Sequence, residues 1–311
     1  MANYTSLSQN EITLISNRFN ITEIDFFITL DGGLENSSYK ISSKGEIYVL
    51  TICEQKSFKK AEELALLLEH LNKNNFNTSK VIPNKDSSPI TLWNKKPIMV
   101  KKYIEGKVEK KLSINLLKLI GEQIAKLHLI PPPSFLPNQV NYGKERFNEL
   151  KKYSNDSKFQ TWLNEKIAYL KPFFEVDLPK SFIHSDIFYD NIIVSNDNLS
   201  VTIMDFEESA FYFRVYDIGM AIIGLCRDDL IVNLDKVKSL LIGYKNINNL
   251  SDNELKSIKA FTIYAGVSMT FWRFVNFNYV KPNPLLSNHY LELKNLTDSL
   301  QKIPDNVFNR L

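Results

Sequence analysis

The stretch 183–191, which reads IHSDIFYDN, places ionisable and amide side chains among isoleucine, phenylalanine and tyrosine. A buried carboxylate destabilises a fold unless it is paired, hydrogen-bonded or coordinated to a metal. His184, Asp186, Asp190 and Asn191 therefore need partners, and the rest of the sequence has to supply them. This stretch decides the interpretation of the whole chain.

The spacing His184-x-Asp186-x4-Asn191 follows a short predicted strand and matches the H-x-D-x-x-x-x-N loop of phosphoryl-transfer enzymes. In that loop the aspartate accepts the proton of the attacking hydroxyl, and the asparagine gives an amide oxygen to Mg²⁺. The histidine is interpreted as a packing and hydrogen-bonding residue. The pattern therefore predicts Asp186 as the catalytic base and Asn191 as a metal ligand.

The segment 191–206, NIIVSNDNLSVTIMDF, predicts two short strands joined by an Asn/Asp turn. Asp205-Phe206 ends this pair, in the position of a D-F-G metal aspartate, and a carboxylate with an amide oxygen suits Mg²⁺. The alternative is that Asp186, Asp190 and Asn191 form only turns and helix caps. The order of the three features favours the phosphoryl-transfer interpretation.

A glycine-containing loop lies upstream between two predicted strands. Glycines let a backbone approach a ligand closely, and exposed N–H groups with serine hydroxyls can receive phosphate oxygens. An ordinary Gly-Gly turn is the competing interpretation. The predicted nucleotide-binding residues of this loop are Gly32, Gly33, Glu35, Asn36, Ser37 and Ser38.

Composition narrows the class of protein. The 311 residues are 44% hydrophobic and 23% charged, as in an ordinary globular protein, and carry a net charge of only +3. That balance argues against a nucleic-acid binder. Cys53 and Cys226 predict buried thiols, and the scattered histidines show no zinc spacing. No signal peptide or membrane span is expected, so a cytoplasmic protein without a membrane partner is predicted.

The periodicity predicts an α+β chain of two parts. The first hundred residues read as strands with one helix, 58–73, whereas 113–128 begins a mainly helical remainder with Ser113 as its cap. Helical patterns at 144–153 and 159–170 follow, and 215–300 is almost wholly helical in pattern. We expect an N-terminal nucleotide-binding lobe over 1–104 and a catalytic, acceptor-binding lobe over 105–311, with a hinge near 104–106.

The quoted stretches resemble those of the aminoglycoside phosphotransferase and choline kinase-like family, and within it most of all bacterial homoserine kinases. GLENSSY resembles their nucleotide loop, YVLTICE a strand, FIHSDIFYDNIIV the catalytic loop and VYDIGMAI the helix with a loop-bracing aspartate, here Asp217. The resemblance implies the bilobal protein-kinase fold. It also implies a kinase that uses ATP and Mg²⁺ on a hydroxylated small molecule, homoserine first, as a monomer or dimer. Adenine is expected near Lys102 and Ile104. Choline, ethanolamine, aminoglycosides and other small acceptors remain alternatives.

Two departures from kinase patterns stand out. The strand lysine that binds phosphate is replaced by Thr51, as the resemblance to homoserine kinases implies, and Lys40 and Lys56 are substitutes only if they are not ordinary exposed lysines. The missing lysine keeps a pseudokinase, a binding module without the reaction, as a hypothesis of another class. Intact Asp186, Asn191 and Asp205 argue against it.

The second departure concerns the acceptor. Glu207 and Glu208 follow Asp205-Phe206 and would suit an ammonium group, while Arg214 and Arg273 could meet a carboxylate. The alternatives are that Glu207 faces solvent and that Arg273 bridges helices. The aromatic series around Arg273 favours core packing over an ammonium cage; it comprises Phe271, Trp272, Phe274 and Phe277.

Overall fold

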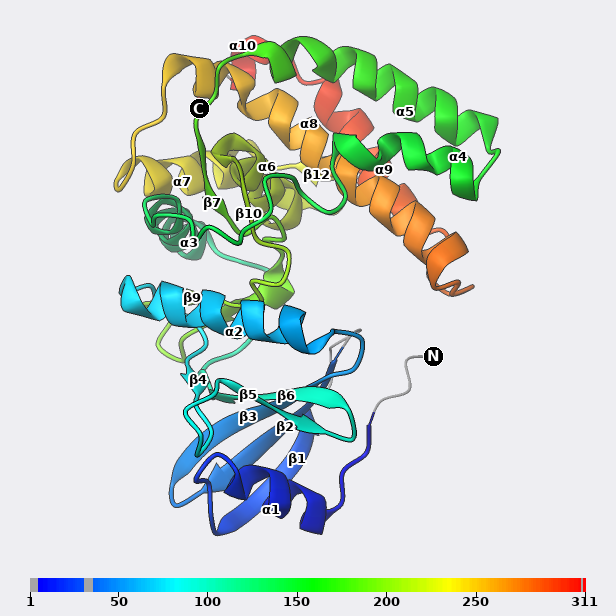
Figure 1. Cartoon of the computed structure of the whole chain (residues 1–311). Coiled ribbons are helices and arrows are strands. Elements are labelled where there is room, and N and C mark those ends of the chain that lie inside the picture. Colours follow the sequence, from blue (N-terminus) through cyan, green and yellow to red (C-terminus); the bar gives the residue numbers. More distant parts are fainter. Residues whose placement is uncertain (1–4, 31–35, 309) are drawn as a thin grey trace. The chain divides into compact units, whose positions relative to one another are not determined.

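The computed structural model describes residues 5–30, 36–308 and 310–311. The chain divides into two compact units, Met1–Glu105 and Gly106–Leu311 (Figure 1). The first is built on an antiparallel sheet and the second is mainly helical, which agrees with the predicted α+β class. Among the described helices, none is long and apolar enough to cross a membrane.

The sheet of the first unit has the strand order β1-β2-β3-β6-β4, and β5 pairs with β6. Its strands are β1 Ile24–Leu30, β2 Asn36–Ser43, β3 Glu46–Cys53, β4 Val81–Ile82, β5 Ile90–Trp93 and β6 Lys96–Lys102. β2 and β3 form a hairpin around Lys44 and Gly45, both at positive φ, so the glycine provides the left-handed turn that the register requires. The predicted strands and their tight turn are confirmed.

Two helices accompany this sheet. The predicted helix is α2 Phe58–Lys73, which buries Ala61, Leu68 and Leu71. The expectation of one helix is wrong, because α1 Gln9–Asn17 precedes the first strand. Ser8 and Glu11 cap its start reciprocally, and its buried isoleucines join the core under the sheet. This S-x-x-E signal before an apolar pair was present in the sequence.

The second unit contains the remaining elements. Its helices are α3 Ile114–His128, α4 Leu150–Tyr153, α5 Ser157–Leu170, α6 Arg214–Leu225, α7 Leu234–Lys245, α8 Asp252–Val275, α9 Tyr290–Gln301 and α10 Asp305–Phe308. Short 3₁₀ turns are η1 Lys144–Glu149, η2 Lys171–Glu175 and η3 Tyr189–Asn191, and η4 Asn276–Val280 is a π-helical turn. Its strands are β7 Lys180–Ile183, β8 Ile192–Val194, β9 Val201–Ile203, β10 Ala210–Phe213, β11 Arg227–Asp228 and β12 Ile231–Val232.

The predicted helix at 113–128 is confirmed as α3, with the Ser113 hydroxyl capping it and its apolar stripe fully buried. Two expectations need correction. The segment 144–153 is mostly a 3₁₀ turn followed by the single turn α4, and the hairpin of β11 and β12 interrupts the helical pattern after residue 215. A turn with Asp229 at positive φ allows that reversal. Both cysteines are buried, as predicted.

Helices α3 and α7 approach closely at two glycines. A Cβ at Gly243 would lie 1.9 Å from the Lys118 carbonyl oxygen, and one at Gly121 would lie 2.0 Å from that of Leu240. Gly243→Ala is therefore expected to lower the free energy of unfolding by about 3 kcal/mol, measured by urea denaturation. Lys238→Ala, on the exposed face of α7, is the matched control and should change little. Because alanine favours a helix over glycine, an unchanged or higher stability for Gly243→Ala would show that the contact is relaxed.

Candidate active site

The residues predicted from the opening stretch lie between β7 and β8 in the second unit. β7 pairs with β10, and the chain then passes through Asp186 and η3 into the hairpin of β8 and β9. The hairpin pairs Ile192 with Ile203, and the Met204 N–H donates to the Asn191 carbonyl at 3.0 Å. This register places Asp205 at the same end of the hairpin as Asn191, as the sequence interpretation requires.

Asn191 links directly to Asp186. Its buried side chain donates from Nδ2 to the Asp186 carbonyl at 2.8 Å and to Asp186 Oδ2 at 3.1 Å. The amide nitrogen is therefore used within the loop. The amide oxygen accepts no hydrogen bond from the part of the chain that the structure describes. An amide oxygen of this kind is a typical ligand of a hard cation such as Mg²⁺.

Negative charge accumulates around Asp186. Burial raises the pKa of its carboxyl group to about 7, and the charges of Asp205, Glu208 and Asp190 add to this rise against the lowering effect of Asn191. A carboxylate that is crowded by like charges is a typical feature of catalytic and metal sites. The donor set of Asp186, Asn191 and Asp205 fits a divalent cation, because such a cation would neutralise this repulsion.

No group of three His, Cys, Asp or Glu that could hold a metal ion occurs within the described ranges. The predicted ligands are a carboxylate and an amide oxygen, and Mg²⁺ is usually bound by one or two protein carboxylates together with water and phosphate oxygens. Asn191 and Asp205 are the residues that would hold the ion. When bound, it would neutralise charge on the transferred phosphoryl group.

Two site residues hold left-handed backbone conformations that side chains rarely adopt. Ser185, which directly precedes Asp186, has φ 64°, and Asp205, which is one of the two predicted metal ligands, has φ 67°. The Ser185 hydroxyl also donates to the Glu208 carbonyl, which ties the two segments together. Such strain persists only where surrounding contacts fix the backbone, and it is concentrated at functional sites.

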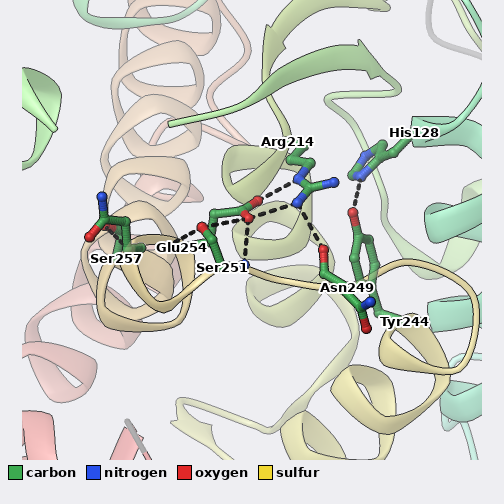
Figure 2. A network of polar contacts seen from close by, with 8 residues as sticks. His128, Arg214, Tyr244, Asn249, Ser251, Glu254 and Ser257 are labelled. Carbon is green, nitrogen blue, oxygen red and sulfur yellow. Dashed lines mark hydrogen bonds and ion pairs between the residues drawn. The ribbon is translucent and has the colours of Figure 1, made fainter. Parts of the chain in front are cut away.

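Asp217 on α6 supplies those contacts. Its fully buried carboxylate accepts from the backbone N–H of Ser185 at 2.7 Å and of His184 at 3.0 Å. His128 on α3 donates from Nε2 to the Asp217 carboxylate at 3.1 Å. Its Nδ1 forms a hydrogen bond of 2.9 Å with the Tyr244 hydroxyl (Figure 2). A chain of side chains from α3, α6 and α7 thus fixes the loop.

His184 is also engaged within the loop. Its Nδ1 accepts from the Asp186 N–H at 3.2 Å, its Nε2 donates to the Met204 carbonyl at 2.9 Å, and its ring packs against Phe206. The imidazole therefore joins the catalytic segment to the segment that carries Asp205. Every atom of the side chain is buried in the fold.

The acceptor candidates separate into different surroundings. Glu208 accepts from Asn141 at 2.7 Å and lies near enough to Asp186 to affect its pKa. Arg214 donates to both carboxylate oxygens of Glu254, from Nε to Oε1 and from Nη2 to Oε2 at 2.7 Å (Figure 2). Its Nη2 also donates to the Asn249 carbonyl at 2.9 Å. Because Glu254 also caps α8, this arginine is part of a structural ion pair. We therefore leave it out of the proposed acceptor site.

Arg273 lies near the end of α8 and contacts Glu292 on α9 at 2.7 Å. The bridge between helices that the alternative interpretation expects is thus present. The aromatic series beside it is largely core, since the Phe159 and Phe274 rings stack at 3.9 Å and the Phe147 and Phe271 rings lie 5.3 Å apart. Glu207 is half-buried.

In the first unit, Gly32, Gly33 and Glu35 lie outside the described residues. Asn36 begins β2, and Ser37 donates to Glu54 at 2.5 Å. Burial opposes ionisation of Glu54, but hydrogen bonds from Lys96, Ser37 and Thr5 lower its pKa to about 2. Ser38 and Thr51 lie on paired strands with their hydroxyl oxygens 3.4 Å apart.

The remaining candidates of this unit are Lys102, Ile104, Lys40 and Lys56. Lys102 ends β6 and pairs with Glu46, and Ile104 follows in the half-buried segment that closes the unit. The Lys40 ammonium lies 4.2 Å from the centre of the Tyr103 ring, which is a cation–π geometry. Lys56 follows β3 beyond Glu54.

Three residues near the loop were not among the site residues predicted from the sequence. His128 and Arg227 gave no motif, although His128 continues the buried stripe of α3. Tyr142 follows a proline-rich segment and donates from its hydroxyl to the Ser185 carbonyl at 3.0 Å. Burial and then the charge of Asp186 raise its pKa well above the ordinary value, so the hydroxyl stays a donor.

The fold and this site define a phosphotransferase of the kinase-like class. Residues 27–238 match the family model described as "Phosphotransferase enzyme family" (APH), which covers more than half of the chain. The chain belongs to that family and is a small-molecule kinase.

Similar proteins agree with this assignment. A homoserine kinase of Agrobacterium fabrum is 24% identical over 271 residues, covering 83% of this chain and 82% of that protein. The structure of a microcompartment-associated aminopropanol kinase has a TM-score of 0.73 at 14% identity, covering 94% of this chain and 97% of the other. An amicoumacin kinase in complex with AMP-PNP and Ca²⁺ has a TM-score of 0.72 at 14% identity, with 96% and 95% covered. These likenesses confirm the kinase-like fold.

Proposed function

We propose that this chain transfers the γ-phosphoryl group of ATP to the hydroxyl of a small amino-bearing acceptor, with homoserine as the first candidate. The observation that carries the proposal is the convergence of Asp186, Asn191 and Asp205 at one end of the β8–β9 hairpin. The AMP-PNP of the similar amicoumacin kinase structure supports a nucleoside triphosphate as donor.

In this mechanism Asp186 orients the acceptor hydroxyl and takes its proton. The hydroxyl oxygen forms a bond to the terminal phosphorus, the bond from that phosphorus to the bridging oxygen breaks, and ADP leaves with the bonding electrons. A carboxyl group with its pKa near 7 is well matched to proton transfer at neutral pH. Most of the rate enhancement would come from alignment and charge neutralisation.

The charges near Asp186 support an acceptor with an ammonium group. Asp190 and Glu208 lie near Asp186 and carry negative charge, and neither is a predicted metal ligand. Homoserine, aminopropanol, choline and ethanolamine all bring a positive charge, and each is named for at least one similar protein or structure. Homoserine is placed first because it is the name of the curated relatives that align over most of the chain.

The test is an acceptor panel with the purified protein, ATP and Mg²⁺. ADP release is measured with homoserine, choline, ethanolamine, methylthioribose and aminoglycosides, and the phosphorylated product is identified by mass spectrometry. Homoserine should give the highest kcat/KM. Turnover of choline or an aminoglycoside with none of homoserine would reject homoserine as the acceptor, and no turnover of any acceptor would reject the kinase mechanism.

A further inference from the structure

A cationic cluster lies in the second unit beside the catalytic loop. Arg273 Nη1 contacts Glu292 Oε2 at 2.7 Å, and Arg227 Nη1 contacts Glu292 Oε1 at 2.7 Å. His289 lies 3.2 Å from the same carboxylate. The arginine side chains are only 11% and 18% exposed, so their charges are largely removed from water.

The charges of this cluster do not balance. Two arginines share one glutamate, and burial and the neighbouring Arg273 lower the pKa of His289 below its ordinary 6.5, so its imidazole is mainly neutral at pH 7. One positive charge is therefore in excess. Burial also lowers the pKa of Arg273 despite the opposing effect of Glu292, which is the sign of an incompletely compensated guanidinium.

Hydrogen-bond donors remain as well. Arg273 donates from Nη1 to Glu292 and to the His289 carbonyl at 3.4 Å. Arg227 Nη1 forms an ion pair with Glu292 and donates to the Asp229 carbonyl at 3.2 Å. Within 5–30, 36–308 and 310–311, Nε and Nη2 of both arginines donate no hydrogen bond. A planar guanidinium with free donors matches a carboxylate through two parallel hydrogen bonds.

The cluster adjoins Asp186 through two elements. Arg273 follows Trp272, whose ring contacts Tyr142, and Tyr142 donates to the Ser185 carbonyl. Arg227 begins β11 directly after α6, where a Cβ on Gly224 would lie 2.3 Å from the Ile187 carbonyl oxygen. The segment before Arg227 thus packs directly against the backbone at Ile187, and the segment of Arg273 reaches the Ser185 carbonyl through Tyr142.

We propose that Arg227 and Arg273, held in place by Glu292, bind the carboxylate of an amino-acid acceptor whose hydroxyl lies at Asp186. This inference rests on the proposed function and narrows it to acceptors with a carboxylate. An amino alcohol without that group would leave Glu292 as the one carboxylate that the two arginines share. The two arginines would meet the carboxylate of a zwitterionic acceptor, and the acidic residues around Asp186 would meet its ammonium group.

The first test compares homoserine with 3-aminopropan-1-ol, which has the same hydroxyl and amine but no carboxylate. In Arg227→Gln and Arg273→Gln, kcat/KM for homoserine should fall roughly 10- to 150-fold through KM, the effect of one lost hydrogen bond to a charged group. The value for 3-aminopropan-1-ol should stay within about threefold. Equal losses with both acceptors would assign the arginines a structural role only and overturn the proposal.

Arg214→Gln is the matched control, because Arg214 pairs with the buried Glu254 on the same helix as Arg273. It should lower the melting temperature without changing the ratio of kcat/KM between the two acceptors. A second measurement uses the wild-type protein alone and does not depend on variants that fold. Calorimetry should show that 2-aminobutanoate binds more tightly than 1-aminopropane by roughly 10- to 150-fold.

Equal affinities in that measurement would overturn the carboxylate site whether or not homoserine is turned over. If homoserine is not phosphorylated but 2-aminobutanoate binds tightly to the wild type and weakly to Arg273→Gln, the carboxylate site stands and homoserine fails as the acceptor. If homoserine is phosphorylated equally well by both arginine variants, the kinase assignment stands and the carboxylate site fails.

Discussion

Asp186→Ala is expected to lower kcat for phosphoryl transfer roughly 10²- to 10⁴-fold while nucleotide binding stays within about threefold of the wild type. The substitution removes the carboxylate that accepts a hydrogen bond from Asn191. This carboxylate lies two residues after the loop histidine, in the position of the predicted base. The acceptor hydroxyl then has no base, whereas the predicted metal ligands Asn191 and Asp205 remain. Single-turnover kinetics and nucleotide titration separate the two effects.

Asp190→Asn is the matched control for this prediction. Asp190 lies in the same loop and is exposed, and its substitution by asparagine also removes one negative charge. It affects the pKa of Asp186 only as one of several nearby charges, so a change of less than about tenfold is expected in kcat. Equal losses in Asp186→Ala and Asp190→Asn would mean that general negative charge, and not a positioned base, supports the reaction.

Asp217→Ala is expected to have the largest effect on stability. It leaves the N–H groups of His184 and Ser185 and the Nε2 of His128 buried without their acceptor. The loss of one member of such a buried charged network lowers the free energy of unfolding by about 3–5 kcal/mol. The released loop would also lose the backbone conformation at Ser185, so kcat should fall with it.

Tyr244→Phe provides a graded comparison at the other end of this network. It removes only the hydroxyl that donates to His128, so about 1 kcal/mol is expected from the same denaturant titration. The role of Asp217 in fixing the loop would be contradicted if Asp217→Ala unfolded at the same denaturant concentration as the wild type and kept its kcat. A larger effect for Tyr244→Phe than for Asp217→Ala would place the centre of the network on α7.

The strand, loop and hairpin of the predicted catalytic segment could be predicted because their sequence signals are local. The spacing from His184 to Asn191 and the hairpin that leads to Asp205 lie within 22 consecutive residues, and the strand register brings the ends together. The stripe of α3 was predictable for the same reason. The helix α1 was not predicted although Ser8 and Glu11 give a capping signal, because a helix of nine residues with only two buried isoleucines has a weak apolar period.

Long-range partners could not be predicted. His128 meets Asp217 across 89 residues and Tyr244 across 116, and nothing in a helical pattern tells which buried groups will meet. Arg273 and Arg214 looked equivalent in the sequence. Their difference depends on Glu254 and Glu292, since one glutamate serves a single arginine and the other is shared.

The left-handed conformation of Ser185 has a consequence for engineering. A glycine would adopt φ 64° without steric cost, so Ser185→Gly would relieve the backbone strain at this position. That change would also remove the hydroxyl that joins the catalytic loop to Glu208. Heat-resistant variants of this chain should therefore be selected on product formation, because the loop is where robustness and turnover make opposite demands.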